Sequence, residues 1–194
     1  MKKYLWLGIL ALVVVVILWL AGYYNSFIGL NENVDTAWSQ VENQYQRRFD
    51  LVPNLVETVK GIVKQEQAVY LGVAEARAKV GQIDLNKISD PAVFKQFQAS
   101  QQELSGALTK LLAVQEAYPV LKYNENFLAL QSQLEGTENR IATERMRYNE
   151  VVRSYNVQAK GIPGKWFVGW AGLPESRSLF EATEGANKTP EVKF

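Results

Sequence analysis

Four charged side chains interrupt the apolar faces of regular helical patterns and are the residues best placed for chemistry. Arg48 and Glu66 fall on the face of the first pattern, and Glu138 and Arg145 fall on the face of the last. If the faces rotate, these charges reach water at the edges. Alternatively, Arg48 or Arg145 pairs with Glu66 or Glu138 in an internal ion-pair network that fixes helix register. A catalytic site is the third interpretation, and the available residue types speak against it.

The chain of 194 residues contains no histidine and no cysteine. Without histidine, Ser–His–Asp chemistry, zinc sites with histidine ligands and Glu-x-x-His di-iron bundles are excluded. Without cysteine, disulfides, thiolate nucleophiles and iron–sulfur clusters are excluded as well. Carboxylates, lysines and serine hydroxyls remain, and no Ser–Lys spacing stands out among them. We therefore expect a protein that is not an enzyme, with no catalytic, cofactor or metal site and no small-molecule ligand indicated.

Three aromatic residues near the C-terminal end, Trp166, Phe167 and Trp170, are the strongest sign of an interaction. They lie in a short apolar segment, residues 165–173, directly after the helix-breaking sequence Ile-Pro-Gly at 162–164. They either cap the open end of a helical bundle, dip into a membrane interface, or form a patch for a partner.

The charge balance excludes one class of partner. The chain has 21 basic and 20 acidic residues, a net charge of +1, and its basic residues do not cluster on one segment. A nucleic-acid-binding domain needs a basic patch or stripe, so we expect no nucleic acid as a partner.

A helix must position the first two charges. From Val34 to Val80 apolar residues recur with strict three–four alternation, which is typical of a helix that packs along a seam in a bundle or coiled coil. The pattern keeps its phase across Pro53, which favours a kink over a turn, and Gly81 is suited to end the helix. The apolar members of this seam are Val34, Trp38, Val41, Tyr45, Val52, Leu55, Val59, Ile62, Val69, Val73, Ala76 and Val80.

Two further long helices are predicted. Asp90-Pro91 is a helix start, and the pattern that follows ends at Ala117, before the corner Tyr118-Pro119. The last helix runs from about Pro119 to Lys160, and Gly161 closes it. Gly136 should lie inside it and allow a neighbouring helix to come close, at a propensity cost of about 1 kcal/mol relative to alanine.

No segment resembles a strand hairpin, so the fold class is all-α: an antiparallel bundle of three to four long helices, the first kinked at a proline, behind an N-terminal transmembrane helix. We divide the chain into an anchor (1–24), a juxtamembrane segment (25–33), the bundle (34–160) and an aromatic tail (161–194). If nothing breaks the helix at 25–33, the anchor helix runs straight into the bundle. Residues 176–182 are suited to one or two further helical turns, and the polar end, 183–194, is predicted to be mobile.

The anchor is predicted from residues 4–24, a run of 21 residues without a charge. At 1.5 Å per residue this helix spans about 31 Å, close to the roughly 30 Å of a hydrocarbon core. A cleaved signal peptide is the alternative, but the run is too long for one and lacks a small-x-small cleavage site. Aromatic residues typical of membrane interfaces mark both ends: Tyr4, Trp6, Trp19, Tyr23 and Tyr24.

The charges beside the anchor indicate its orientation. Lys2 and Lys3 precede the apolar run, whereas only acidic charges follow it as far as Arg47. The positive-inside rule then predicts a single-pass protein with a cytoplasmic N-terminus and an extracytoplasmic body.

Several segments resemble the LemA family. They are RRFDLVPNLVETVKG at 47–61, YPVLK at 118–122 with Asn124, Asn126, Phe127 and Leu130-Gln131 after it, LEGTENRIA at 134–142, and then Arg145, Tyr148-Asn149 and Tyr155-Asn156. The resemblance extends over almost the whole chain, including the anchor and the closing EVKF at 191–194. It departs after the bundle, where the family usually has Phe-Pro in place of Ile162-Pro163.

The resemblance implies a bacterial, membrane-anchored helical bundle with no established biochemical activity. Genes of the family often neighbour genes for membrane metalloproteases or TPM-domain proteins, which suggests membrane organisation or partnership by association. We therefore expect a non-catalytic scaffold or oligomerising interaction module at the bacterial cell membrane, with copies of itself or another membrane protein as partner. The alternative is an accessory or regulatory subunit of a membrane enzyme or protease complex.

Overall fold

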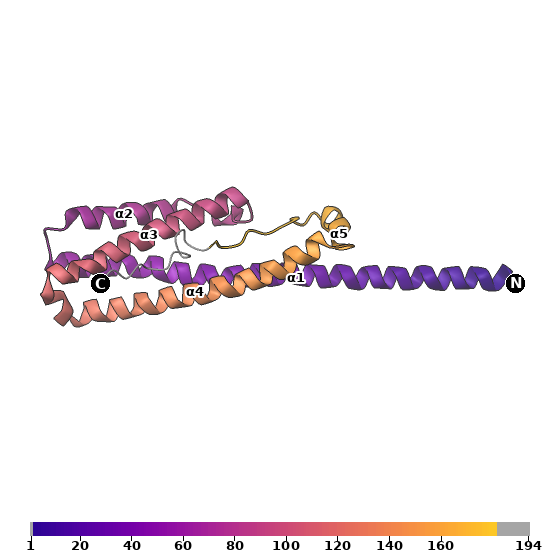
Figure 1. The fold of residues 1–194 in the computed structure, drawn as a ribbon, viewed down its shortest axis with the longest axis horizontal. Helices are drawn as coiled ribbons and strands as arrows, with labels where there is room; N and C mark the ends of the chain where they lie inside the picture. Colours follow the sequence, from indigo (N-terminus) through magenta and orange to yellow (C-terminus); the bar gives the residue numbers. More distant parts are fainter. Residues whose placement is uncertain (1, 182–194) are drawn as a thin grey trace, which may run out of the picture. The chain divides into compact units, whose positions relative to one another are not determined.

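The structure, a computed structural model, describes residues 2–181, except for the side chains of residues 2, 3 and 5. Within this part the chain is helical and has no strand, which confirms the all-α prediction. The helices are α1 (Lys2–Ile62), α2 (Gln67–Gly81), α3 (Pro91–Ala117), α4 (Glu125–Lys160) and α5 (Gly164–Ala171) (Figure 1). Two 3₁₀ turns, η1 (Leu85–Lys87) and η2 (Pro119–Tyr123), join α2 to α3 and α3 to α4.

Helix α1 is 61 residues long and continues without a break through residues 25–33 and through Pro53. The apolar N-terminal run and the first seam therefore belong to one helix. The seam is buried as predicted from Val34 to Val59.

The prediction that this helix continues to residue 80 is wrong, because α1 ends at Ile62 and α2 begins at Gln67. After Val59 the next buried side chain is Val63, and its carbonyl accepts a hydrogen bond of 2.6 Å from the Tyr70 hydroxyl. The buried face of α2 is then Tyr70, Val73 and Ala76. Apolar residues occupy both 62 and 63, so the seam pattern runs on across a turn.

Helix α3 begins and ends as predicted. The Asp90 side chain accepts a hydrogen bond of 2.8 Å from the Ala92 backbone N–H, and Pro91 stands in the first turn. Its buried face contains Phe94, Phe97, Leu104, Leu108 and Leu111. Together these side chains form one buried, apolar face of the helix.

Helix α4 starts later than predicted. Residues 119–123 form η2, and the Asn124 side chain accepts a hydrogen bond of 2.9 Å from the Phe127 N–H at the start of the α-helix. Gly136 lies inside α4 as predicted, but no heavy atom lies within 4 Å of the position a Cβ would take. Gly136 therefore does not mark a close helix approach.

The predicted helical turns at residues 176–182 are also wrong for the described residues 176–181, which are not helical. Side-chain hydrogen bonds hold this backbone instead: the Arg177 N–H donates to Asn156 Oδ1 at 2.7 Å, and Asn156 Nδ2 donates to the Arg177 carbonyl at 3.0 Å. The predicted mobility of 183–194 concerns residues outside the described part.

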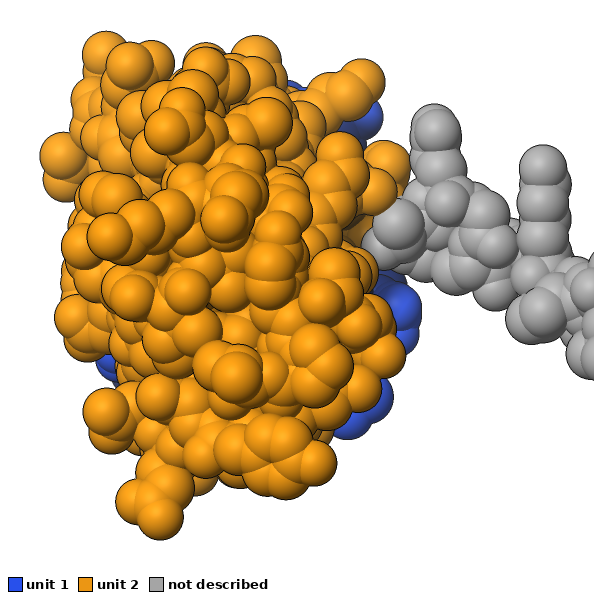
Figure 2. Space-filling view, turned by 90° about the vertical axis from the view of Figure 1, so that its left-hand side faces the viewer, with its two compact units in different colours: residues 1–43, 146–177 blue, residues 44–145, 178–194 orange. Residues whose placement is uncertain are grey.

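The described chain forms two compact units, coloured blue and orange in Figure 2. Unit 1 comprises residues 2–43 and 146–177, and unit 2 comprises residues 44–145 and 178–181. In unit 1 residues 27–38 of α1 pair in antiparallel fashion with the end of α4, with Phe27 on Tyr155 (ring centroids 5.2 Å apart) and Trp38 on Tyr148 (5.8 Å). In unit 2 the end of α1, α2, α3 and the start of α4 enclose a core that includes Val52, Leu55, Val59, Val73, Leu104, Leu108, Leu111, Leu121, Phe127 and Leu134.

Candidate functional site

In unit 2 the structure brings together two of the four seam charges. Arg48 is buried, with 1% of its surface exposed, and its Nη1 lies 2.7 Å from Oε1 of Glu138. The Glu138 side chain is 40% exposed, so one partner of the ion pair is dry and the other reaches solvent. The pair joins α1 to α4 within this unit.

The Arg48 guanidinium also binds α3. Its Nη1 donates to Oγ of Ser105 at 2.7 Å, and its Nη2 donates to the Gln101 carbonyl at 3.2 Å and to the Gln101 side-chain oxygen. The Tyr45 ring stands 5.1 Å from the guanidinium carbon. One buried arginine thus ties α1 to two other helices, and only its Nε has no partner among the described residues.

A cleft of about 390 Å³ opens beside this arginine. Arg145 lies on its rim, where it donates to the Glu181 carbonyl at 3.0 Å and stacks on Phe180 at 4.7 Å. Burial raises the pKa of Tyr45, and the charges of Arg145 and Arg48 oppose that rise. The cleft is lined by Tyr45, Arg48, Gln98, Gln101, Gln102, Ser105, Gly106, Thr109, Glu138, Ile141 and Arg145.

Glu66 lies elsewhere. Its carboxylate accepts a hydrogen bond of 3.2 Å from the Tyr118 hydroxyl, at the join between the start of α2 and the end of α3. Loss of hydration, together with this carboxylate, raises the pKa of Tyr118. Glu66 therefore interrupts the apolar seam because it lies in the turn between α1 and α2, which the apolar pattern did not predict.

The Arg48 cluster is suited to holding helices in register. The Glu138 carboxylate and the Ser105 hydroxyl both accept hydrogen bonds from the Arg48 guanidinium. They are therefore not arranged as a general base beside a nucleophile. Across residues 2–181 no group of three or more acidic side chains is placed to hold a metal ion.

The second candidate site lies in unit 1, where α5 packs on α1. Phe167 contacts Tyr23, with ring centroids 5.1 Å apart, and Trp170 contacts Tyr24 at 5.6 Å. The helix buries Val168 but leaves its tryptophans outside, with Trp166 70% and Trp170 76% exposed. All three aromatic residues singled out in the sequence thus belong to one short helix.

Beside α5 is a hollow of about 510 Å³ that we call the aromatic groove. Every residue that lines it is apolar or aromatic, and two of them, Trp19 and Leu20, come from α1. Ile162, at the other wall, is 79% exposed. The complete lining is Trp19, Leu20, Ile162, Pro163, Trp166, Phe167 and Trp170.

Contacts on both sides of α5 fix its place in unit 1. At its first residue, Gly164 is buried, and a Cβ there would collide with the Gln158 carbonyl and lie 3.0 Å from the Tyr23 hydroxyl oxygen. After it, the Tyr155 hydroxyl donates to the Pro174 carbonyl at 2.6 Å. Arg177 then returns to α1, with its Nη2 2.8 Å from Asn31 Oδ1 and 3.2 Å from Asp35 Oδ1.

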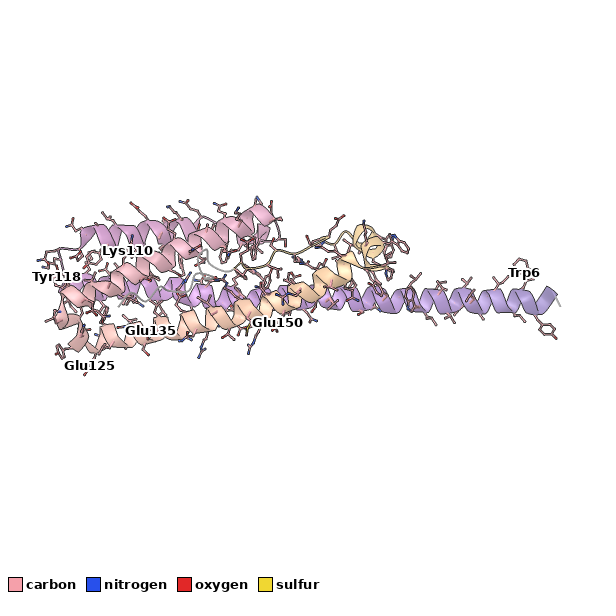
Figure 3. All side chains as sticks on the ribbon, in the orientation of Figure 1. Trp6, Lys110, Tyr118, Glu125, Glu135 and Glu150 are labelled. Atoms are coloured by element: carbon pink, nitrogen blue, oxygen red, sulfur yellow. The ribbon has the colours of Figure 1, made fainter. Side chains whose placement is uncertain are left out.

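The anchor residues lie along the start of α1. In Figure 3 Trp6 projects from a stretch along which no other segment of unit 1 runs, and it is 72% exposed. Helix α1 is the one helix among the described residues that is long and apolar enough to cross a membrane, and none of its most apolar stretch is buried. Tyr4 and Trp19 are exposed like Trp6, whereas Tyr23 and Tyr24 are half-buried beneath α5.

The sequence patterns did not predict which polar residues bind Arg48 in unit 2, nor the contacts between Asn156 and Arg177 in unit 1. Gln101 had a signal, because it replaces an apolar residue on the face that carries Phe97 and Leu104. Ser105, Asn156 and Arg177 had none, because polar residues on a helix surface or in a tail are ordinary.

Comparison with known proteins confirms the resemblance. The model of the LemA family matches residues 37–194. Magnetosome protein MamQ 2 and Magnetosome protein MamQ 1 of Paramagnetospirillum magneticum are each 24% identical over 180 residues, an alignment that covers 84% of this chain and 66% of the relative. Magnetosome protein MamQ of Magnetospirillum gryphiswaldense is 24% identical over 189 residues, which cover 87% and 70%. The chain thus spans about two thirds of the length of these relatives.

Proposed function

The chain belongs to the LemA family, and from this premise we propose that it is a membrane-anchored scaffold: a non-catalytic helical bundle that oligomerises or holds a partner at the bacterial membrane. The N-terminus is cytoplasmic and the body extracytoplasmic. The anchor is residues 1–24, the bundle begins at residue 34, and the segment between them continues the same helix.

The observation that carries this proposal is the exposed apolar surface of α1. Large side chains from Leu7 to Leu20 stand open along the helix, several of them more than half exposed. A soluble protein rarely leaves such a continuous apolar surface in water, and a helix satisfies its own backbone hydrogen bonds, as a lipid environment requires. The bilayer is the covering that fits this length and composition.

The contacts of the helical body favour a scaffold over an enzyme. Arg48, the one charged side chain that is buried among those the structure describes, binds the side chains of three other residues. The MamQ relatives are named for a cellular structure, the magnetosome, and not for a reaction. Both observations favour a protein that organises other molecules.

A test of the anchor compares two leucines of nearly equal exposure. Leu12, in α1, is 65% exposed, and Leu71, in α2, is 61% exposed. The chain has no native cysteine, so Leu12→Cys and Leu71→Cys each introduce a single thiol. On intact cells a membrane-impermeant maleimide should label Leu71→Cys and leave Leu12→Cys unlabelled until detergent is added. Equal labelling of both variants would contradict the anchor, and labelling of Leu71→Cys only after cell opening would contradict the topology.

The accessory-subunit alternative is favoured by the end of unit 2 at η2, between Tyr118 and Glu125 in Figure 3. Tyr123 is 85% and Val120 is 63% exposed there, a surface on which a partner protein would fit. Thiol-specific cross-linking of Tyr123→Cys in native membranes, followed by mass spectrometry, separates the two roles. Cross-links between copies support the scaffold, and a stable second protein supports the accessory role. Lys110→Cys, an exposed position on α3, serves as the control.

A further inference from the structure

We propose that α5 and the aromatic groove are a second membrane attachment, seated in the interfacial layer of the bilayer, with phospholipid chains in the groove. This inference rests on the proposed anchoring by α1. It adds that unit 1 itself enters the lipid surface at the level where α1 leaves the membrane.

The length of the membrane-crossing segment determines where α1 leaves the bilayer. A helix needs about 20 residues to cross a hydrocarbon core of roughly 30 Å, so an α1 that enters at Tyr4 leaves at about Tyr23 or Tyr24. Those two residues are the ones on which α5 packs, through Phe167 and Trp170. The contacts within unit 1 therefore set α5 at the depth where the membrane-crossing segment ends.

The side chains around α5 have the composition of a membrane interface. Trp166, Trp170 and Ile162 are large apolar side chains of this region, and each is at least 70% exposed. Tryptophan is enriched at membrane interfaces because its ring is apolar and its N–H can reach the headgroup region. Lys160 and Lys165 are also exposed beside the groove, and long lysine side chains place their ammonium groups at headgroup level.

A phospholipid acyl chain is the occupant that suits the aromatic groove. Trp19 and Leu20 line the groove and belong to the membrane-crossing segment of α1. If this segment crosses the membrane, lipid already contacts Trp19 and Leu20, so a second copy of the chain or another protein would have to displace lipid to bind in the groove. Because the groove lining is apolar throughout, an acyl chain fills it without leaving a polar group unpaired.

The experiment uses the full chain in vesicles of phosphatidylcholine and phosphatidylglycerol. Single-cysteine variants carry an environment-sensitive fluorophore at Ile162 or at Val157, two residues of unit 1 that are 79% and 70% exposed. Leu12→Cys reports the anchor. The vesicles contain nitroxide lipids with the quencher either near the glycerol or in the middle of the acyl chain.

We expect the label at residue 162 to show blue-shifted emission and stronger quenching by the shallow nitroxide. The label at residue 12 should be quenched more strongly by the deep one, and the label at 157 by neither. If residue 12 is quenched but residue 162 behaves like residue 157, the second attachment is refuted and the anchor stands. If residue 12 is not quenched, the proposed anchoring itself fails. Disulfide-linked dimers of Ile162→Cys without quenching would assign the groove to a second copy and overturn the proposal.

A second pair of variants tests whether packing on α1 sets the depth of α5. Gly164→Ala introduces a Cβ that collides with the Gln158 carbonyl, whereas Gly169→Ala, in the same helix, meets no atom within 4 Å. We expect shallow quenching at residue 162 to be lost in Gly164→Ala and kept in Gly169→Ala, with helical circular dichroism retained in both. Unchanged quenching in Gly164→Ala would refute the claim that the packing of α5 places it in the interface.

Discussion

Removal of the Glu138 charge should reveal how strongly the buried arginine depends on its one carboxylate. Glu138→Gln keeps the shape of the side chain but leaves the Arg48 side chain, only 2% exposed, without the counter-charge of Glu138. Loss of one partner of a fully buried pair costs about 3–5 kcal/mol. Because the Glu138 side chain is 40% exposed, water screens part of the interaction. The neutral bonds to Ser105 and Gln101 also remain, so we expect a loss of about 2–3 kcal/mol.

The measurement is urea unfolding of the full chain in detergent micelles, followed by circular dichroism at the helix band. A loss of this size corresponds to a fall of about 4–12 °C in the melting temperature. Glu135→Gln is the matched control, because it makes the same change one turn earlier in α4 at an exposed carboxylate. It should change the free energy of unfolding by less than about 0.5 kcal/mol.

A double-mutant cycle separates the ion pair from other effects of the substitution. In an Arg48→Met background the buried charge is gone, and the Glu138 carboxylate can take up water on its exposed side. Glu138→Gln should then cost less than about 0.5 kcal/mol, which leaves a coupling energy of about 2 kcal/mol. If Glu138→Gln costs no more than Glu135→Gln in the wild-type background, the pair does not hold the helices and our reasoning about Arg48 is refuted.

Three further changes test other parts of the structure. Gly136→Ala adds a methyl group that meets no neighbouring atom in α4, so it should raise the free energy of unfolding by about 1 kcal/mol. A fall in this free energy, measured by urea denaturation, would show that the added methyl group makes an unfavourable contact. Asn156→Ala removes both hydrogen bonds to the Arg177 backbone, so trypsin cleavage after Arg177 should become about 5–30-fold faster than in a Ser154→Ala control. Equal rates in the two variants would show that these hydrogen bonds do not hold the backbone at Arg177. Burial raises the pKa of Tyr148 to about 12. Since the folded state then holds a proton that the unfolded state releases above pH 10, stability should be constant below pH 10 and fall by up to about 2–3 kcal/mol towards pH 12, and Tyr148→Phe should flatten that fall in urea titrations.

The helical fold was largely readable from the sequence because burial in this bundle follows one regular apolar pattern. Asp90-Pro91 predicts the start of α3, since an aspartate before a proline satisfies the first free backbone N–H groups. The turn after Ile62 escaped prediction because apolar residues stand on both sides of it. A periodic pattern shows which residues are buried, but it does not show where the chain reverses when the turn is itself buried.

The candidate sites were readable only as single residues. The seam pattern singled out Arg48 and Glu138, yet they are 90 residues apart in sequence, and Gln101 on a third helix completes the cluster. No local rule predicts such a triple, because it depends on the relative rotation of three helices. The aromatic residues of α5 were equally visible, but their packing on Tyr23 and Tyr24 depends on how α4 returns along α1 in unit 1.

The contacts around α5 fix its position in unit 1, so its tryptophans would meet lipid at a fixed depth. A loose aromatic tail would also partition into an interface, so exposure alone does not require a built position. Here the helix is held at its first residue by the close approach of Gly164 to Gln158, and after its end by Arg177 on Asn31 and Asp35. Such contacts are expected if the tryptophans must keep one level relative to α1, because each reduces the freedom with which α5 could slide or lift away. If lipid affinity were the only requirement, neither the buried glycine nor the returning arginine would be needed.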